Sequence, residues 1–165
     1  MRRIFFILPA ILALTAYAVA AGADVVTVAK DKKIKIDYTL TVDGKMIDTS
    51  NGKQPLEYTQ GAGMIIPGLE KALEGLKVGN EKDVVVSAHD GYGFVDPTAF
   101  KEVPVSFFPA DVHPQAGMVV QLQDQQGQLI PATIAEVKAD SVRLDFNHPL
   151  AGKELHFNVK VVSIE

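Results

Sequence analysis

The feature that most constrains this fold is a strand-like pattern at the C-terminal end that has no partner nearby in the sequence. Residues 153–165, KELHFNVKVVSIE, place apolar side chains at alternate positions, which is typical of a half-buried strand. Before it come three patterned segments that are separated by turn signals and can pair with one another: 117–125, 129–138 and 141–147. The last strand therefore needs a partner much earlier in the chain. We infer that the block before it interrupts a first domain.

Strand patterns that could supply this partner lie in the first half of the chain. Residues 32–42, KKIKIDYTLTV, alternate apolar and polar side chains, and Asp43-Gly44 is a tight-turn signal that returns the chain into 45–47. Residues 55–59 predict a short edge strand, because Pro55 cannot donate to a sheet. Residues 82–88, KDVVVSA, predict a buried strand.

One segment changes from period two to the period of a helix. From Pro67 onward, four apolar residues fall on one helical face: Leu69, Ala72, Leu73 and Leu76. Pro67 suits a first helical turn, and Gly79 suits a left-handed C-terminal cap. We therefore expect one helix of about three turns. Together with the strands it predicts an α+β protein.

The proline-rich stretch 95–117 opens the inserted block, and we expect no long regular element there. The predicted organisation is thus a first domain of residues 24–94 and 147–165, interrupted by a small, mainly β domain of residues 95–146.

Residues 1–23 have the three-part layout of a secretory signal peptide: two arginines, an apolar run and small residues. We expect cleavage near Ala20 or Ala23 and export, with the periplasm as the destination. The alternative is a retained membrane anchor, since residues 4–23 are just long enough to span a bilayer.

Several classes of site are disfavoured by composition and spacing. The net charge of −4 becomes −6 without the two N-terminal arginines, which argues against nucleic acid and anionic membranes as partners. There is no cysteine, and the four histidines lack metal-site spacing. The glycines of GAGMIIPG have the wrong spacing for a nucleotide loop, and no G-x-S-x-G motif is present. The sequence therefore predicts no metal and no cofactor.

Apolar and aromatic residues nevertheless occur where a simple core does not require them. They stand on a strand, at a strand end, at the mouth of the helix and between two glycines: Tyr38, Ile47-Asp48, Ile65-Ile66 and Tyr92. Any one of them alone is compatible with an ordinary core position. A tyrosine between two glycines is harder to explain in that way, because loops lie on the surface.

These motifs, in this order, resemble the FKBP-type peptidyl-prolyl isomerases. The matching stretches are DYTL, DGKMIDTS, PLEY, GAGMIIPGLEKALEGLKVG, DGYG and NHPLAGKELHFNVKVVSIE, and the similarity covers essentially all of residues 30–165. They look closest to the SlyD-like group, which carries an insert-in-flap domain. The resemblance implies an antiparallel half-barrel sheet over one short helix, with a prolyl pocket between them.

The resemblance also implies which residues form that pocket. Those assigned to catalysis are Tyr38, Asp48, Ile66, Tyr92 and Phe157. Those assigned to substrate binding are Ile47, Leu56, Tyr58, Ile65 and Leu69, with Phe107 and Phe108 as a client surface on the inserted domain. Many single-domain relatives have tryptophan where this chain has Leu69, so we expect a wider pocket and weak binding of the macrolide ligands of the family.

The function implied is prolyl isomerisation of unfolded or partly folded proline-containing polypeptides, with chaperone-like client binding by the insert. The alternative is a binding-only chaperone that uses the pocket as a peptide cradle without useful catalysis. In either case we expect a monomer. It is also open whether Phe107 and Phe108 bind clients or fill a small core.

Overall fold

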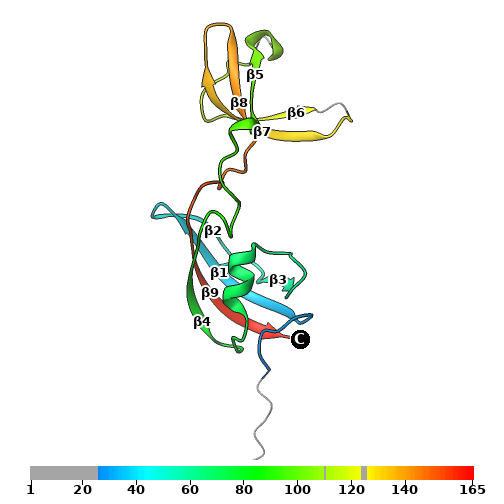
Figure 1. Ribbon diagram of the computed structural model, residues 1–165, viewed down its shortest axis with the longest axis vertical. Coiled ribbons are helices and arrows are strands. Elements are labelled where there is room, and N and C mark those ends of the chain that lie inside the picture. The colour runs from blue at the N-terminus through cyan, green and yellow to red at the C-terminus, as the bar shows by residue number, and fades with distance from the viewer. Residues whose placement is uncertain (1–25, 110, 124–125) are drawn as a thin grey trace, which may run out of the picture.

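The computed structural model describes residues 26–109, 111–123 and 126–165, so the proposed signal segment 1–23 lies outside the described residues. Two antiparallel sheets occupy opposite ends of the long axis (Figure 1). One short α-helix packs on the larger sheet. The predicted α+β fold class is confirmed, and both sheets are open. No helix within the described ranges is long and apolar enough to cross a membrane.

The larger sheet, called the first sheet here, is organised around its longest strands. Its strands are β1 (Lys33–Val42), β2 (Lys45–Thr49), β3 (Leu56–Thr59), β4 (Glu81–Val86) and β9 (Leu155–Ile164). Along one edge β1 pairs with β9, and along the other it pairs with β2 and β3 at different ends. β9 also pairs with β4. The C-terminal strand thus finds the distant partner that its pattern required.

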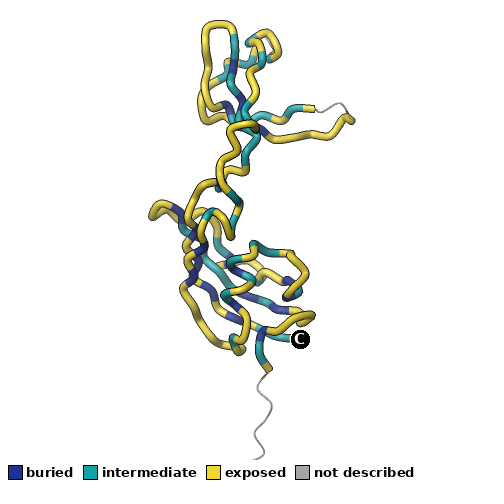
Figure 2. Tube along the Cα trace, in the orientation of Figure 1, coloured by how far each residue is buried: buried dark blue, intermediate teal, exposed yellow. Residues whose placement is uncertain are grey.

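Helix α1 (Pro67–Leu73) covers the inner face of this sheet (Figure 1). Leu69 and Leu73 are buried against the inward residues of β1, β4 and β9, and the core contains fourteen buried residues. Period two puts the apolar side chains of β1 and β9 on this face, where burial stabilises them by roughly 25 cal/mol per Å² of apolar surface. The dark interior of the lower lobe in Figure 2 is this core.

The smaller sheet, called the second sheet, is built entirely from residues between β4 and β9. Its strands, in spatial order, are β5 (Phe100–Pro104), β8 (Ser141–Asp145), β7 (Leu129–Val137) and β6 (Val119–Gln123). Two 3-10 helices flank β5: η1 (Pro97–Ala99) and η2 (Val105–Phe107). Only four of its described residues form a buried cluster: Ala132, Ile134, Val142 and Leu144.

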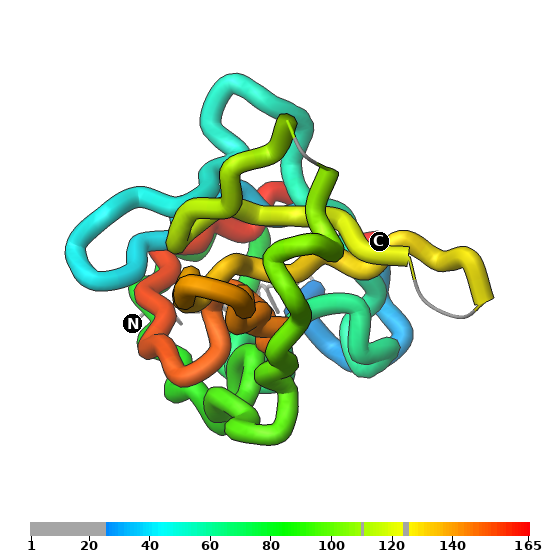
Figure 3. The backbone as a smooth tube through the Cα atoms, turned by 90° about the horizontal axis from the view of Figure 1, so that it is seen from above, coloured from blue at the N-terminus to red at the C-terminus, as the bar shows by residue number. Residues whose placement is uncertain are grey.

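The chain passes between the two sheets twice, once after β4 and once before β9. These two segments run side by side (Figure 1). The Asp96 amide donates to the Asn147 side chain at 2.8 Å, and the Asn147 side chain donates to the Asp96 carbonyl at 3.1 Å. Seen along the long axis, the β6–β7 hairpin projects sideways from the second sheet (Figure 3). At the far end of the first sheet, Lys33 and Glu165 exchange both backbone hydrogen bonds.

Two local predictions need correction. The helix has seven residues and ends before Gly75, whose φ of 79° and hydrogen bond to the Val28 carbonyl turn the chain away; Gly79 lies in a later turn. Strand β4 is half-buried rather than buried, because it is an edge strand and Val85 is 60% exposed. The described residues of the proline-rich stretch contain no long regular element, as expected: its longest is β5, five residues ending at Pro104, where a proline costs the sheet little.

Candidate functional site

A cavity of about 420 Å³ opens between the N-terminal end of α1 and the inner face of the first sheet. Its lining comes from β1, β2, β3, β9, α1, the loop before α1 and the turn after β4. The lining residues are Tyr38, Leu40, Asp48, Leu56, Gly63, Met64, Ile65, Ile66, Leu69, Tyr92 and Phe157. We call this space the first-sheet cavity.

The bottom of the cavity is apolar because core side chains form it. Leu69 is 3% exposed and Phe157 is 7% exposed, and both belong to the main core. The rings of Tyr38 and Phe157 lie 6.4 Å apart at 51°, which is a favourable tilted arrangement. These walls rest on packed elements of the sheet and helix, so the cavity has a fixed shape.

The mouth of the helix supplies a backbone donor beside this apolar surface. Ile66 is the N-cap residue, with φ −60° and ψ 140°, and its side chain cannot cap the helix as serine or aspartate would. Its carbonyl accepts from Leu69 and Glu70. The hydrogen bonds among the described residues leave the Ile66 amide without an acceptor. A bound carbonyl oxygen is the partner this amide lacks.

At the rim, Asp48 accepts a short hydrogen bond from the Tyr38 hydroxyl. Its other oxygen accepts from the Thr49 amide at 2.8 Å and from Lys53 at 3.1 Å. The hydrogen bonds from Tyr38, Lys53 and Thr49 lower the pKa of Asp48 to about 2. The same bond to Asp48, helped by burial, raises the pKa of Tyr38 to about 12. At neutral pH the pair is therefore a carboxylate and a neutral phenol.

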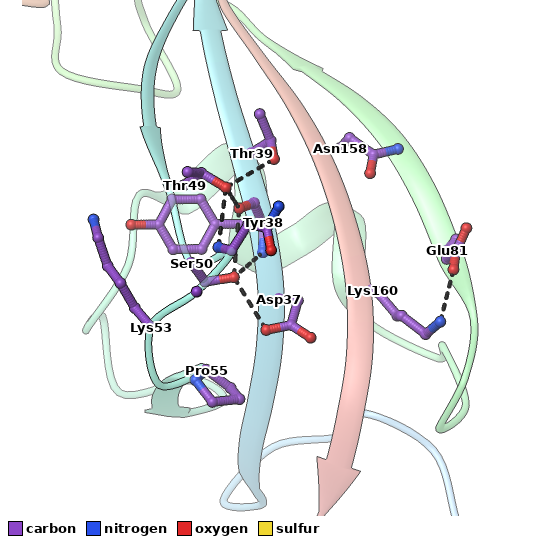
Figure 4. A pocket seen from close by; sticks show the side chains of 12 residues that line it. Asp37, Tyr38, Thr39, Thr49, Ser50, Lys53, Pro55, Glu81, Asn158 and Lys160 are labelled. Carbon is purple, nitrogen blue, oxygen red and sulfur yellow. Dashed lines mark hydrogen bonds and ion pairs between the residues drawn. The ribbon is translucent and has the colours of Figure 1, made fainter.

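A polar network on the outer face of the sheet fixes the strand end that carries Asp48 (Figure 4). Ser50 is 4% exposed; its hydroxyl donates to Asp37 at 3.0 Å and accepts from the Tyr38 amide at 2.9 Å. These bonds belong to a polar hollow of about 440 Å³ in which Lys160 pairs with Glu81 at 2.9 Å. The charged groups of this hollow all have partners: Asp37 accepts from Ser50, Lys53 pairs with Asp48 and Lys160 pairs with Glu81. We therefore interpret the hollow as a support for the rim.

Tyr92 reaches the cavity from the turn after β4. It is 39% exposed and lies between Gly91 and Gly93, and Gly93 has a φ of 78°. The Gly91 and Gly93 amides both donate to the Ala88 carbonyl, which closes a tight turn. Tyr38 and Tyr92 therefore both line the first-sheet cavity, Tyr38 from β1 and Tyr92 from this turn.

Eight of the site residues expected from the sequence come together around the first-sheet cavity: Tyr38, Asp48, Leu56, Ile65, Ile66, Leu69, Tyr92 and Phe157. Two others do not line it. Ile47 is 50% exposed, because period two turns it away from the face used by Asp48. Tyr58 is 1% exposed and donates to Gln60 inside the core, where burial raises its pKa to about 12. We expected Tyr58 to contact the substrate, but in the structure it is part of the main core.

The two phenylalanines expected on a client surface lie on the second sheet. Phe107 is 60% exposed, whereas Phe108 packs against the small buried cluster, and the two rings meet edge to face at 6.2 Å. The sequence left open whether these two residues bind clients or fill a small core. In the structure Phe108 contributes to the small core, whereas Phe107 faces outward.

Three lining residues were missed from the sequence: Leu40, Gly63 and Met64. Leu40 follows Tyr38 by two positions, so strand alternation could have found it. Gly63 and Met64 immediately precede the isoleucine pair, but a loop carries no periodicity that would place them. Met64 is held in place by the Thr59 amide, which donates to its sulfur at 3.4 Å.

The arrangement suits binding and distortion of a chain rather than bond cleavage. The cavity can hold an apolar ring, while the Ile66 amide, the Tyr92 hydroxyl and the Tyr38–Asp48 pair can address polar groups around that ring. Within the described ranges, no group of three or more histidine, cysteine or acidic residues is placed to hold a metal ion.

Comparison with known proteins matches residues 25–162 to the FKBP-type peptidyl-prolyl cis-trans isomerase family. The chain is similar to the short-type peptidyl-prolyl cis-trans isomerase of Methanocaldococcus jannaschii, with 40% identity over 151 residues, covering 82% of this chain and 93% of that protein. It is also similar to the isomerase SlyD of Escherichia coli K12, with 43% identity over 138 residues, covering 83% and 70%. SlyD of Treponema pallidum is 40% identical over 138 residues, covering 83% and 78%.

Proposed function

This chain belongs to the FKBP-type peptidyl-prolyl cis-trans isomerases, in their SlyD-like group, and on that premise we propose that the first-sheet cavity is its prolyl site. The observation that carries this assignment is that eight of the residues implied by the family resemblance meet around one cavity. The substrates we propose are unfolded or partly folded polypeptides that contain proline. We expect the protein to act as a monomer.

Rotation about a peptide bond costs roughly 18–20 kcal/mol because amide resonance must be broken. The planar amide is more charge-separated than the twisted one. An apolar cavity therefore disfavours the planar ground state relative to the twisted transition state. A proline ring seated on Leu69 and Phe157 places the preceding peptide bond in this environment. No nucleophile is needed, because no covalent bond breaks.

Each polar group at the rim has a proposed role. The free Ile66 amide holds a carbonyl of the substrate. The Tyr92 hydroxyl donates to a second carbonyl. Asp48 orients the Tyr38 hydroxyl, and its fixed charge favours the amide in its twisted form.

The site assignment is tested by Asp48→Asn, with Asp43→Asn as a matched control. Asp43 lies on the same hairpin and also pairs with a lysine, Lys153 at 2.7 Å, but is not among the residues of the cavity. In a tetrapeptide assay with a chelator present, we expect kcat/KM to fall roughly tenfold for Asp48→Asn and to stay unchanged for Asp43→Asn. Equal rates for both variants and the parent would show that the rim assignment is wrong.

We further propose that the second sheet binds clients in a chaperone-like way. A second, mainly apolar hollow of about 350 Å³ lies on it, which we call the second-sheet groove. It is lined by Val119, Ile130, Pro131, Ala132, Thr133, Asp145, Phe146, Asn147, His148 and Pro149. Phe107 is also exposed on this part of the chain. Exposed apolar surface of this kind is typical of an interaction site.

Deletion of residues 95–146, with a short loop closing the gap, tests this second proposal. Closure entropy changes slowly with loop length, so the first sheet should still fold. We expect tetrapeptide isomerisation within about tenfold of the full chain, but strongly impaired refolding of a proline-limited protein. Equal refolding by the deletion variant would contradict client binding. Loss of tetrapeptide activity in a folded variant would mean that these residues help to build the prolyl site.

We also propose that the protein is exported and folds clients in the periplasm. The support is the arginine-led apolar segment at residues 1–23. N-terminal sequencing of the protein isolated from cells should give a start near Ala20 or Ala23. An intact N-terminus on membrane-extracted protein would favour a tethered form.

A further inference from the structure

The ring of Tyr92 is stacked on the ring of His148, a residue 56 positions later in the chain. The two ring centroids lie 3.8 Å apart and the planes differ by 5°. Tyr92 lines the first-sheet cavity, and His148 lies in the segment that returns from the second sheet to β9. His148 also borders the second-sheet groove. One imidazole therefore stands between the proposed prolyl site and the groove on the inserted part of the chain.

The imidazole has a fixed orientation. The Leu150 amide donates to its Nδ1 at 3.1 Å, which makes Nδ1 an acceptor. The Ala151 amide donates to the His148 carbonyl at 2.8 Å, so that the backbone turns tightly around this side chain. The ring is thus held by its own turn before it contacts Tyr92.

A backbone hydrogen bond joins the two segments next to the stack. The Gly152 amide donates to the Gly93 carbonyl at 2.8 Å. Tyr92 itself is flanked by two glycines, whose backbone is intrinsically permissive, and its side chain is 39% exposed. The turn fixes the backbone of Tyr92, and the ring contact with His148 adds a restraint on one face of its side chain.

We propose that His148 is a positioning residue for Tyr92: the stacked, turn-anchored imidazole fixes the tyrosine ring so that its hydroxyl meets the substrate carbonyl. This inference rests on the proposed role of Tyr92 in the prolyl site. His148 acts through Tyr92 and makes no contact with the reacting amide. Because the hydroxyl is already oriented, substrate binding does not have to pay the entropy of orienting it.

Two substitutions separate the ring contact from the turn. His148→Phe keeps a flat aromatic ring against Tyr92 but loses the Nδ1 acceptor. His148→Asn keeps an acceptor for the Leu150 amide, with its side-chain oxygen near the position of Nδ1, but loses the ring. If the stack positions Tyr92, phenylalanine preserves activity and asparagine does not. If the turn alone matters, the order is reversed.

The expected kinetic effect falls on kcat for a proline tetrapeptide. His148→Ala and His148→Asn should lower kcat and kcat/KM by about three- to tenfold with KM little changed, because the aligned hydroxyl acts in the transition state. His148→Phe should stay close to the parent. His113→Ala, which changes an exposed histidine outside both cavities, is the matched control and should have no effect.

A spectroscopic readout reports the stack without reference to activity. The ring protons of Tyr92 lie over the face of an imidazole in the parent, so their NMR signals should move downfield in His148→Ala and His148→Asn and remain upfield in His148→Phe. Unchanged Tyr92 signals in His148→Ala would overturn the proposal.

A double-mutant cycle with Tyr92→Phe completes the test. Once the Tyr92 hydroxyl is removed, His148→Ala should cause no further loss of kcat. A full additional loss would overturn the positioning role and leave Tyr92 in the site. If Tyr92→Phe alone leaves kcat unchanged, the role of Tyr92 fails and this inference fails with it. A normal Asp48→Asn defect in that case would retain the prolyl site itself.

Discussion

The two sheets differ in how many apolar residues they bury. Around the first sheet and α1, fourteen described residues form one buried core, and a cavity opens at the mouth of the helix. In the second sheet four buried residues hold four strands together, and large apolar side chains such as Phe107 and Val119 remain 60% and 67% exposed. Figure 2 shows dark blue, buried segments in both lobes, with more of them in the lower lobe than in the upper one.

This difference follows from how much surface each sheet can cover. The first sheet has a helix on its inner face, so period-two side chains from β1 and β9 are removed from water on that side. The second sheet has no α-helix on either face among the described residues, and its apolar groove stays open. A deep core keeps a catalytic cavity in shape, whereas a thin one leaves apolar surface available to a partner.

The largest difference should come from removing one phenylalanine from each region. Phe157 is 7% exposed and belongs to the main core, so Phe157→Ala should lower the free energy of unfolding by about 3–5 kcal/mol. Phe107 is 60% exposed, so Phe107→Ala should change it by about 0.5 kcal/mol or less. Denaturant unfolding measures both. A large loss for Phe107→Ala would show that the second sheet depends on that ring.

A substitution inside the thin core tests whether the regions unfold separately. Leu144 is fully buried, and Leu144→Ala should cost about 2–5 kcal/mol. With only four buried residues in the cluster, we expect this loss to open the second sheet locally. Amide hydrogen exchange should then rise in β5–β8 and stay slow in β1 and β9, with tetrapeptide activity retained. Faster exchange in both sheets together would mean that they form one cooperative unit.

The packing of α1 on β4 gives a smaller effect. A methyl group added at Gly68 would lie 2.5 Å from Val86 Cγ1 and 3.0 Å from Asp90 Cβ. Gly68→Ala should therefore destabilise the protein by about 1–3 kcal/mol, although alanine favours helix formation. Because the helix carries Ile66, kcat/KM should fall as well. Lys71→Ala, on an exposed part of the same helix, is the control; if both variants behave alike, the contact at Gly68 is not tight.

The smallest effect concerns titration at the rim. Asp48 has a pKa lowered from 3.8 to about 2, so its contribution to stability is complete above pH 3.8 and is lost as pH falls through about 2. Tyr38 has a pKa raised from 10.0 to about 12, so its contribution is complete below pH 10 and is lost as pH rises through about 12. NMR titration measures both groups. Asp48→Asn should lower the pKa of Tyr38; an unchanged value would mean that burial alone raises it.

Much of the first sheet could be predicted from the sequence, because local patterns and the fold agree there. Period two in 32–42 and 153–165 identified β1 and β9 and the face on which Phe157 lies. The Asp43-Gly44 signal identified the β1–β2 turn, in which both residues have positive φ. The proline at 67 marked the start of the helix. These features depend on neighbouring residues, which a sequence displays directly.

Other features depended on contacts between residues distant in the chain. The length of α1 was decided at Gly75, where a hydrogen bond to Val28 replaces the next helical turn. Tyr58 carries the same alternation as Leu56, yet one is 1% and the other 36% exposed, because Tyr58 packs in the main core whereas Leu56 lines the open cavity. The stack of His148 on Tyr92 joins segments 56 residues apart. No period or turn signal encodes such a contact, because it forms only when the second sheet returns the chain to the first.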